Sequence, residues 1–433
     1  IHIKIIIISN NYLSIEKAYS DYSKNHDGSH APYAIAFDGT YVYSSLWGVI
    51  QVHNVSNVNS PTLHAFIETN ANTYQIDVSG DYIFLSNRST GGIQIIDTRL
   101  LKTVSRWTNS GGDNLWSNSS NWVNNTLPTS SDDVTILNGS SVTVDASASA
   151  AYVNIVSGGT LGLNSGSKLS VNNDFLNAGT TTLNSSSNSY SALLVSGSSS
   201  GNITYNRYVN TVGSGEWDLV GSPVGSQSIS GFVSSNSGSV ATSGSTYAIG
   251  TYSNASGGGW SNYTTSSGSN DVANAGNFPA GTGYQMASEG GGTLTFTGTV
   301  ATSDQTVDIT DNSGSGGTKW NLVANPFPSY LNGNSNAGAN NFFSTNLAVL
   351  HDTYAAIYGW DADGSGYTPY NATNTWYIAP GQAFFVASAN ASGSSVAFNE
   401  NMQNASPSSY DDFVANTVQD EVEIGLYNGD SKL

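Results

Sequence analysis

The sequence predicts an all-β protein made of propeller-like blades, a short β-solenoid-like stack of strands and duplicated β-sandwich units. Charged residues make up only 9% of the 433 residues, whereas aromatic residues make up 11%. Short runs of Tyr, Trp, Val and Ile suit a half-buried pleated surface, and the Gly, Asn and Ser between them suit turns. Internal repeats of sheet-like segments occur near the N-terminus and again in the C-terminal half.

The composition narrows the possible partners and chemistry. The chain has 30 acidic and 11 basic residues and a net charge of −19. Such a charge opposes binding to nucleic acid and to anionic lipid, because both carry negative phosphates. The chain has no cysteine, so disulfides, thiolate metal sites and cysteine nucleophiles are excluded. We therefore expect no nucleic-acid partner.

The first residues, IHIKIIIISNNY, form an apolar run. The run is too short for a membrane helix, which needs about 20 apolar residues, and it lacks the small-residue cleavage pattern of a secretory signal. We predict a β-strand here, no membrane span in this chain, and a start inside a longer protein.

Two segments near the N-terminus are copies of each other, Tyr33–Asn54 and Tyr74–Asp97. Their period of 41 to 43 residues is that of a four-stranded propeller blade. Residues 1–105 are therefore predicted to hold two propeller-like β-repeats. Since a closed propeller usually has at least four blades, either further blades precede these two or the sheets pack on something else. The repeat pattern favours further blades.

From Val134 the pattern changes to apolar-x-apolar triplets, whose starts are separated by 8, 11, 8 and 8 residues. Alternation buries one strand face, and its short period is typical of a β-solenoid. We predict such a stack over residues 106–200, with an ordinary sandwich of short hairpins as the alternative. The triplets are Val134–Ile136, Val142–Val144, Val153–Ile155, Leu161–Leu163 and Leu169–Val171.

The stretch Trp107–Ile136 stands at this change of pattern and contains three tryptophans and an acidic pair. We interpret it as an N-terminal cap whose tryptophans cover the end of the stack. Asp132 and Asp133 would converge poorly as a catalytic or metal-binding pair, because adjacent strand side chains point to opposite faces. An Asx turn before the first strand is the favoured interpretation.

From residue 201 a longer unit occurs twice. Four ordered matches recur at offsets of 103, 107, 100 and 102 residues. They predict β-sandwich unit 1 over 201–305 and unit 2 over 306–405, or two halves of one double sandwich, followed by a truncated β segment over 406–433. Trp217 and Trp320 open matched strands and are predicted core residues. The matches pair Trp217–Pro223 with Trp320–Pro326, Thr246–Tyr252 with Thr353–Tyr358, Gly281–Ser288 with Gly381–Ser388, and Leu294–Phe296 with Val396–Phe398.

The strongest metal candidate is a calcium site at Asp361, Asp363 and Ser365. These residues alternate around Gly364, as oxygen ligands do in calcium loops. The closing bidentate glutamate of such loops is missing, so a plain turn is the competing interpretation. The histidines show no zinc-binding motif, although His26 and His30 share a polar loop. We predict no cofactor other than calcium at this loop.

Four tryptophans, Trp47, Trp260, Trp360 and Trp376, lie beside turn-rich segments. An exposed indole there could stack on a sugar, so these residues are the candidate glycan-stacking set. The competing interpretation is a core plug, since tryptophan is largely buried in small sheets.

No catalytic motif is present: the sequence has neither a G-x-S-x-G elbow nor a phosphate-binding or dinucleotide fingerprint. We therefore predict a non-enzyme. A glycosidase or lyase site remains the alternative, because two acids that meet only across the fold leave no signal in a single sequence.

The chain resembles a layout found in large secreted proteins of the Bacteroidetes, notably flavobacteria, including propeller repeats with "YVY…G-I-Q-V-x-D" blades. In that layout "W-S-x-x-x-N-W…P-x-x-x-D-D-V-x-I" opens strand repeats. The resemblance implies export by the type IX route and display on, or release from, the cell surface. It implies no enzymatic activity, and the family's C-terminal sorting domain is not present in this chain. The matching segments are Trp107–Ile136, Asn202–Tyr208, Trp217–Val224, Trp320–Pro328, Pro380–Val386 and Phe398–Gln403.

These observations together predict a non-catalytic extracellular protein with a structural or adhesive function, able to assemble with copies of itself if the strand stack ends in unpaired edges. The expected partners are other surface proteins, the protein itself or extracellular polysaccharide. The alternative is a glycan-binding accessory region of a larger polysaccharide-degrading enzyme.

Overall fold

The computed structural model describes residues 4–8, 12–17, 34–38, 41–46, 49–55, 62–69, 73–79, 82–87, 92–98, 104–211, 217–265, 268–361, 366–373, 375–405, 427–428 and 431–432. Strands dominate these residues and the helices are short, which confirms the all-β class. The chain divides into unit 1, Ile1–Val104, and unit 2, Ser105–Leu433.

Unit 1 contains two antiparallel sheets that share one core. Each sheet holds one of the two sequence repeats, and Tyr43, Ile50 and Val52 of the first pack with Ile83 and Leu85 of the second. The first sheet has the strand count of a propeller blade, whereas a closed propeller stays a prediction. The sheets are β3(Ala34–Phe37), β4(Tyr41–Leu46), β5(Val49–Asn54) and β6(Thr62–Glu68), then β7(Thr73–Ser79), β8(Tyr82–Asn87) and β9(Ile93–Asp97), beside a separate pair, β1(Lys4–Ile8) and β2(Tyr12–Lys17).

The second sheet of unit 1 exposes an apolar outer face. Ile93 and Ile95 are 72% and 60% exposed. By the sequence repeat they correspond to Ile50 and Val52, which are fully buried against the second sheet.

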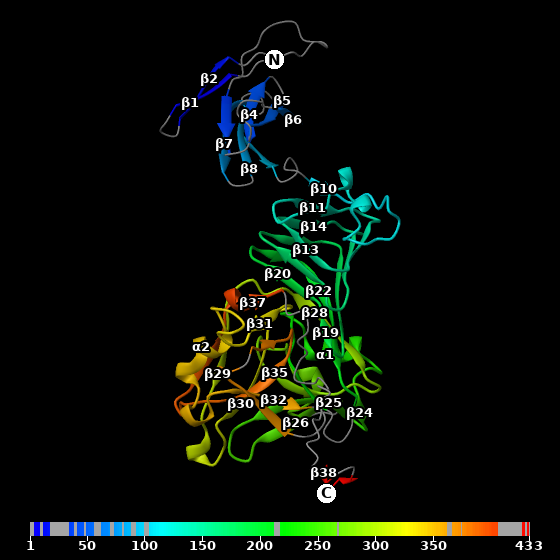
Figure 1. Ribbon diagram of the computed structural model, residues 1–433, viewed down its shortest axis with the longest axis vertical. Coiled ribbons are helices and arrows are strands. Elements are labelled where there is room, and N and C mark those ends of the chain that lie inside the picture. The colour runs from blue at the N-terminus through cyan, green and yellow to red at the C-terminus, as the bar shows by residue number, and fades with distance from the viewer. Residues whose placement is uncertain are drawn as a thin grey trace. The chain divides into compact units, whose positions relative to one another are not determined.

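Unit 2 begins with a β-solenoid of about four turns, which confirms the predicted stack and excludes hairpins as its basis. Figure 1 shows its strands as successive steps. Strands of consecutive turns pair in parallel and in register, as Val134 pairs with Val153. Three sheets run along it: β10(Val104–Arg106), β11(Asp133–Ile136), β14(Tyr152–Ile155), β17(Phe175–Asn177) and β21(Ser199–Ser200); β12(Ser141–Val144), β15(Thr160–Leu163), β18(Thr180–Ser186) and β22(Asn202–Val209); and β13(Ser147–Ala150), β16(Lys168–Val171) and β20(Ala192–Val195), with β19(Ser189–Tyr190) pairing β18.

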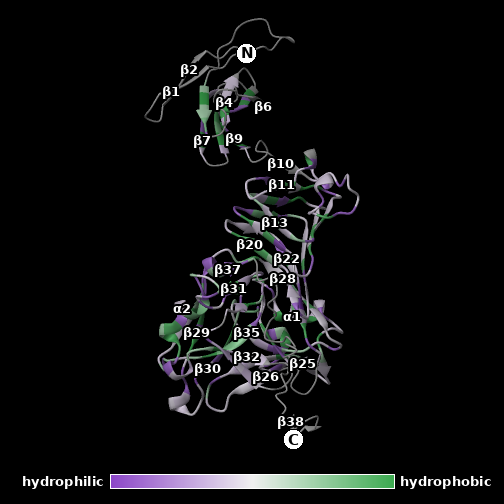
Figure 2. Ribbon diagram, in the orientation of Figure 1, coloured by the Kyte–Doolittle hydropathy of each residue, from purple (hydrophilic) through white to green (hydrophobic). Residues whose placement is uncertain are grey.

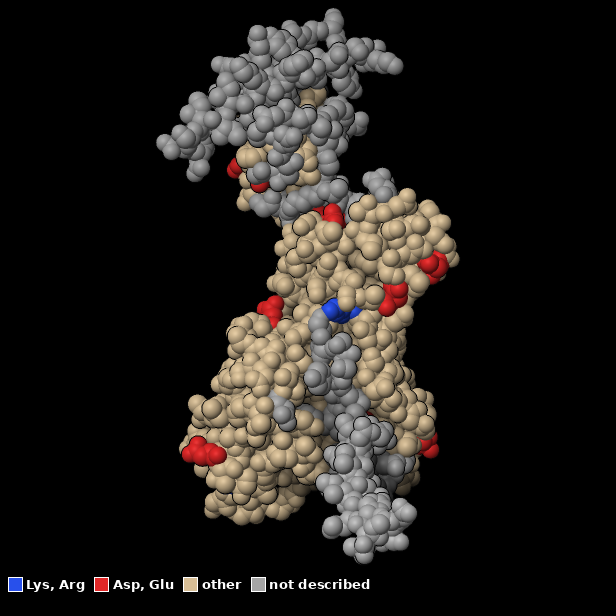
Figure 3. Space-filling view, viewed as in Figure 1, with Lys and Arg blue, Asp and Glu red and all other residues tan. Residues whose placement is uncertain are grey.

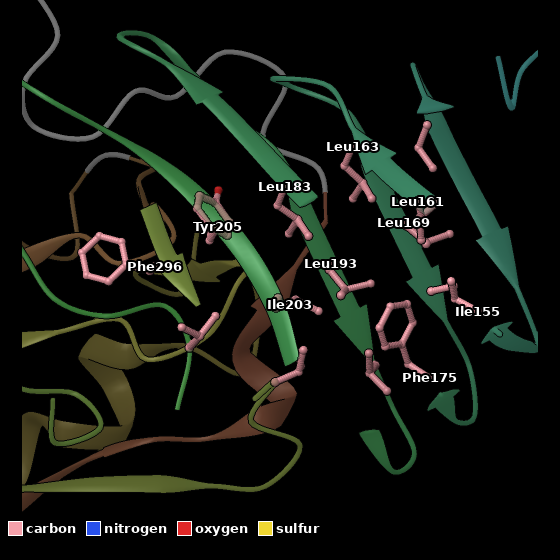
Figure 4. Packing of buried hydrophobic residues seen from close by; sticks show 14 of the residues in the cluster. Ile155, Leu161, Leu163, Leu169, Phe175, Leu183, Leu193, Ile203, Tyr205 and Phe296 are labelled. Atoms are coloured by element: carbon pink, nitrogen blue, oxygen red, sulfur yellow. The ribbon is translucent and has the colours of Figure 1, made fainter. Parts of the chain in front are cut away.

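The triplets predicted the solenoid because their apolar residues all point inward. Leu161, Leu163 and Leu169 have no exposed surface, while Gly162 and Lys168, their neighbours on the same strands, are partly exposed. Figure 4 shows these side chains in rows between the strands, and Figure 2 shows strands that carry both hydrophobic and hydrophilic residues. Similar residues of successive turns stack on one another and fill the core.

One solenoid turn requires glycine. Gly201 has φ +80°, and a Cβ there would lie 1.8 Å from the carbonyl oxygen of Asn177. Because both the backbone and the space exclude a side chain, Gly201→Ala is expected to destabilise unit 2 by about 1–3 kcal/mol. Urea unfolding checks this, with Gly112→Ala as the control: Gly112 has φ +76° but open space at its Cβ. Equal losses in both variants would contradict the steric account.

The Trp-rich stretch covers the first solenoid turn. Trp107, Trp116 and Trp122 are buried in the same core as the solenoid strands. The ring centroid of Trp122 lies 5.0 Å from that of Trp107 and 4.7 Å from that of Trp116, both edge-on. Asp132 accepts hydrogen bonds from the amide and hydroxyl of Thr129. These contacts match the predicted roles of tryptophan plug and acidic turn cap.

The last solenoid strand of one sheet is paired. Self-assembly through the end of the stack would need this strand to be unpaired. Strand β22 pairs along its whole length with β28(Gly292–Thr299), from Asn202↔Thr299 to Val209↔Gly292. The core continues across residues 200–201 into the following region, where the sequence suggested a change of domain. This edge of β22 is therefore not free for self-assembly, because β28 returns from about 90 residues later to occupy it.

The remainder of unit 2 repeats one order of elements, as the sequence offsets predicted. Each half has an outer strand pair, a short helix capped by Ser228 or Asn341, and a larger sheet. In the first half the helix is α1(Ile229–Ser235) and the sheet is β23(Asp218–Val220), β27(Tyr284–Met286), β25(Thr246–Ser253), β24(Thr242–Ser243) and β26(Gly259–Thr264). In the second, β29(Gln305–Ile309) pairs β36(Ser394–Phe398), the helix is α2(Phe342–Asn346), and the sheet is β30(Trp320–Ala324), β35(Ala383–Ala387), β32(Ile357–Asp361) and β33(Gly366–Tyr370), with β31(Tyr330–Asn332), β34(Tyr377–Ile378) and β37(Gln403–Asn404) beside it.

The two halves meet along a reciprocal seam. Gly221 donates its amide to the carbonyl of Gly381 at 2.8 Å, and Ala324 donates to the carbonyl of Gly281 at 2.7 Å. In the repeat alignment Gly221 corresponds to Ala324, and Gly281 to Gly381. Each half therefore gives the other the same hydrogen bond, an arrangement typical of a twofold interface.

Candidate functional site

The site is built on the two hairpins that flank the seam. In the first half, Tyr252 of β25 is the cross-strand partner of Trp260 of β26. Their ring centroids are 5.3 Å apart at 64°, the edge-to-face geometry that aromatic pairs prefer. Trp260 is 39% exposed, so its indole has contacts on one side and solvent on the other.

The second half places an aromatic pair on its corresponding hairpin. Trp360 of β32 is the cross-strand partner of Tyr367 of β33, with centroids 4.9 Å apart at 61°. Tyr367 is 45% exposed and Trp360 is half-buried. Two of the four predicted stacking tryptophans, Trp260 and Trp360, thus occupy matching hairpins.

Phe385 of β35 joins the two pairs. Its centroid lies 4.8 Å from Tyr252, 6.0 Å from Trp260 and 5.5 Å from Tyr367, while its own side chain is 6% exposed. The ring is therefore a buried floor between half-exposed neighbours. We call Tyr252, Trp260, Trp360, Tyr367 and Phe385 the seam aromatics.

Uncharged polar groups adjoin the seam aromatics. Gln285 Nε2 donates to Asn262 Oδ1 at 3.0 Å, and Asn262 Nδ2 donates to the Tyr247 carbonyl at 2.8 Å. Asn262 lies two residues after Trp260 and therefore on the same face of the strand. Amides beside aromatic rings provide both the stacking and the hydrogen bonding that sugar recognition requires.

The local electrostatics favour an uncharged ligand. Burial, followed by electrostatic repulsion between its ionised form and that of nearby Tyr252, raises the pKa of Tyr367 to about 12, so its phenol is neutral at physiological pH. Among the residues of β25, β26, β32 and β33, only Asp361 is charged. Figure 3 shows acidic side chains scattered singly over the visible face.

The other predicted residues lie elsewhere. Trp376 is 4% exposed, packs in the second-half core and donates its indole N–H to the Asn371 carbonyl at 2.6 Å, which corrects its assignment to an exposed stacking set. Trp320 and Trp217, both predicted as core residues, are only partly buried and pack against the edges of apolar clusters. The remaining candidates, including the calcium site, fall outside the described residues. They are Trp47, Asp363, Ser365, His26, His30 and the side chain of Asp361.

Three of the seam aromatics, Tyr252, Tyr367 and Phe385, were not predicted as site residues. A signal for them exists in the sequence, because Tyr252 and Tyr367 lie on hairpin arms opposite the predicted tryptophans. Only strand register shows that they are direct partners. Phe385 occupies the position that corresponds to Gln285 in the first half. The contacts of its ring with the other aromatic residues become evident only from the pairing at the seam.

The residues that the structure describes contain no group of three or more His, Cys, Asp or Glu side chains that could hold a metal ion. Within the same residues, no helix has the length and apolarity needed to cross a membrane.

Comparison with known protein families identifies a match over most of the chain. The model of a family described as a domain of unknown function, DUF8693, matches residues 106–424. No curated protein and no solved structure matches the chain. The matched range contains the cap, the solenoid and both halves.

Proposed function

The chain belongs to the DUF8693 family, and from that premise we propose that it is a non-catalytic, extracellular adhesive protein that attaches to uncharged polysaccharide through the seam aromatics. The observation that carries this proposal is the grouping of Trp260 and Tyr367 around Phe385, with both outer rings at least 39% exposed. Tryptophan and tyrosine are enriched among the residues that contribute most of the binding energy at interfaces.

A rigid support strengthens the proposal. The rings project from paired strands rather than from long loops, and strand-borne sites hold their geometry better than loop-borne ones. Tyr252 and Phe385 pack beneath them within the apolar cluster at the seam. A ligand would therefore meet rings that are already ordered, which lowers the entropy cost of binding.

The proposal includes localisation and finer architecture. The resemblance of Trp107–Ile136 and the later segments to secreted Bacteroidetes proteins supports display on, or release from, a bacterial cell surface. The repeats and the four-stranded sheet of unit 1 support a propeller, and the paired sheets of each half support β-sandwiches. Calcium binding at the Asp361–Ser365 loop remains part of the proposal, with metal titration by calorimetry as its test.

The same surface suits the alternative function, a glycan-binding accessory region of a larger polysaccharide-degrading enzyme. Both functions need the same stacking rings, so binding alone does not separate them. Attachment of whole cells that display the protein supports adhesion. Stimulation of a linked hydrolase on insoluble polysaccharide supports the accessory function.

A neutral-glycan array followed by calorimetry tests the proposal. Trp260→Ala is expected to weaken binding at least about tenfold, because truncation of an aromatic hot spot costs about 2 kcal/mol or more and about 1.4 kcal/mol corresponds to tenfold. Tyr82→Ala is the matched control, since Tyr82 is 40% exposed but belongs to unit 1. Binding as tight in Trp260→Ala as in the unaltered chain, or no binding across the array, would overturn the proposal.

A further inference from the structure

Four of the five seam aromatics form two equivalent pairs. In β25 and β27, Gly250 pairs with Gln285, and in β32 and β35, Tyr358 pairs with Phe385. Because Gln285 corresponds to Phe385 in the sequence repeat, the strand register aligns Gly250 with Tyr358, one residue beyond the alignment that the sequence offset of 107 gives. Two residues further along each strand, Tyr252 therefore corresponds to Trp360.

The hairpin partners follow the same relation. Trp260 faces Tyr252, and Tyr367 faces Trp360, so Trp260 corresponds to Tyr367. The two most exposed rings of the site are thus matching residues of the two halves, 39% and 45% exposed. Both rings contact the ring of Phe385, whose centroid lies 6.0 Å from that of Trp260 and 5.5 Å from that of Tyr367.

The repeat is broken at the polar positions. In the first half, Gly250 faces Asn262 across the hairpin, and in the second half Tyr358 faces Pro369. The amide pair of Asn262 and Gln285 therefore adjoins Trp260 and has no counterpart beside Tyr367, where Pro369 and Phe385 occupy those positions. The two rings are equivalent for stacking and different for hydrogen bonding.

We propose that Trp260 and Tyr367 are two stacking subsites for separate units of one linear, uncharged polysaccharide chain that crosses the seam, with the Asn262–Gln285 amides setting its direction. This inference rests on the proposed function and specifies its substrate class. A repeating polymer is the ligand that presents the same sugar face to two equivalent rings. A branched or terminal sugar would engage one ring only.

Uncharged polymer fits the surroundings better than acidic polymer. A carboxylated or sulfated chain would need cationic partners, and β25, β26, β32 and β33 contain no Lys or Arg. The net charge of −19 adds a general repulsion of polyanions.

Two linked subsites predict a dependence on ligand length. A short sugar occupies one ring at a time, whereas a chain that spans both makes its second contact intramolecularly. The second contact then benefits from a high effective concentration. Affinity should therefore rise abruptly at the length that first reaches both rings, and change little beyond it.

Calorimetry on the full 433-residue chain with linear oligosaccharides of β-linked glucose, mannose and xylose, each from disaccharide to octasaccharide, tests this. We expect a rise of at least about tenfold at one length. Trp260→Ala and Tyr367→Ala should each remove the rise and leave weak binding of the short sugars. Trp260→Phe should restore much of it, and the Tyr82→Ala control should keep it.

The outcomes separate the inference from the function beneath it. Binding that has no step with length, or a step that survives both single variants, overturns the two-subsite inference and leaves glycan binding in place. If Trp260→Ala loses all binding while Tyr367→Ala loses none, the site has a single ring, and this result also overturns the two-subsite inference.

Stronger binding of polyuronate than of neutral chains would overturn the substrate class. No binding to any probe would remove both the inference and the proposed function. Near-ultraviolet circular dichroism confirms that each variant is folded.

Discussion

Replacing Trp122 by alanine is expected to destabilise unit 2 by about 3–5 kcal/mol, the range for a fully buried large aromatic residue. Trp122 is 1% exposed and packs edge-on against both other cap tryptophans. Its indole N–H also donates to the carbonyl of Trp116 at 2.8 Å, so truncation removes a buried hydrogen bond and opens a cavity. Denaturant unfolding followed by near-ultraviolet circular dichroism measures the loss.

Leu127→Ala provides the control for this experiment. Leu127 belongs to the same cap segment but is 39% exposed, so its truncation should change stability by less than about 0.5 kcal/mol. A Trp122→Ala variant as stable as Leu127→Ala would show that the cap does not stabilise the first solenoid turn. Trp122→Phe should fall between the two, because it refills part of the cavity without the hydrogen bond.

Arg207→Met is expected to cost about 2–4 kcal/mol, although it removes a charge from the interior. Arg207 on β22 has no exposed surface, and it donates from Nε to the Pro380 carbonyl at 2.8 Å and from one terminal nitrogen to the Tyr208 carbonyl at 2.6 Å. Its guanidinium carbon lies 4.3 Å from the Tyr190 ring centroid. Each buried carbonyl left without its donor costs about 1–3 kcal/mol, and the cation–π contact adds about 2 kcal/mol when desolvated. Relief of the buried charge offsets part of this.

Lys168→Met tests whether charge alone matters, since it removes one positive charge from a partly exposed solenoid position. It should have little effect. Arg207→Lys keeps the charge but loses the planar fork, so it should retain only part of the stability. Stability of Arg207→Met at or above that of the unaltered chain would mean that the desolvation cost exceeds the value of the hydrogen bonds.

The sequence was most informative where structure depends on local periodicity. The triplets that include Leu161 and Leu163 predicted the solenoid, because a parallel stack repeats the same alternation in each turn. The tandem matches at Trp217 and Trp320 predicted the duplication, since each half preserves the order of its strands. These features depend on residues that lie close together in the sequence or recur at fixed offsets.

Features that depend on pairing across long separations could not be predicted. Nothing near Asn202 indicates that β22 pairs with β28, and nothing near Gly221 indicates its bond to Gly381. The site shows the same limit: Trp260 and Trp360 were identified by residue type and turn context, whereas Trp376, which has the same context, is buried. Burial depends on which elements pack over a turn, and one segment does not contain that information.

The reciprocal seam also bears on the ancestry of the protein. Its paired bonds, from Gly221 to Gly381 and from Ala324 to Gly281, are those that two identical molecules would exchange about a twofold axis. A single ancestral half could therefore have existed as a homodimer before duplication fused two copies into one polypeptide. Fusion freed each copy to diverge, and the exchange of Gln285 for Phe385 at matching positions is a difference that a symmetric dimer could not encode.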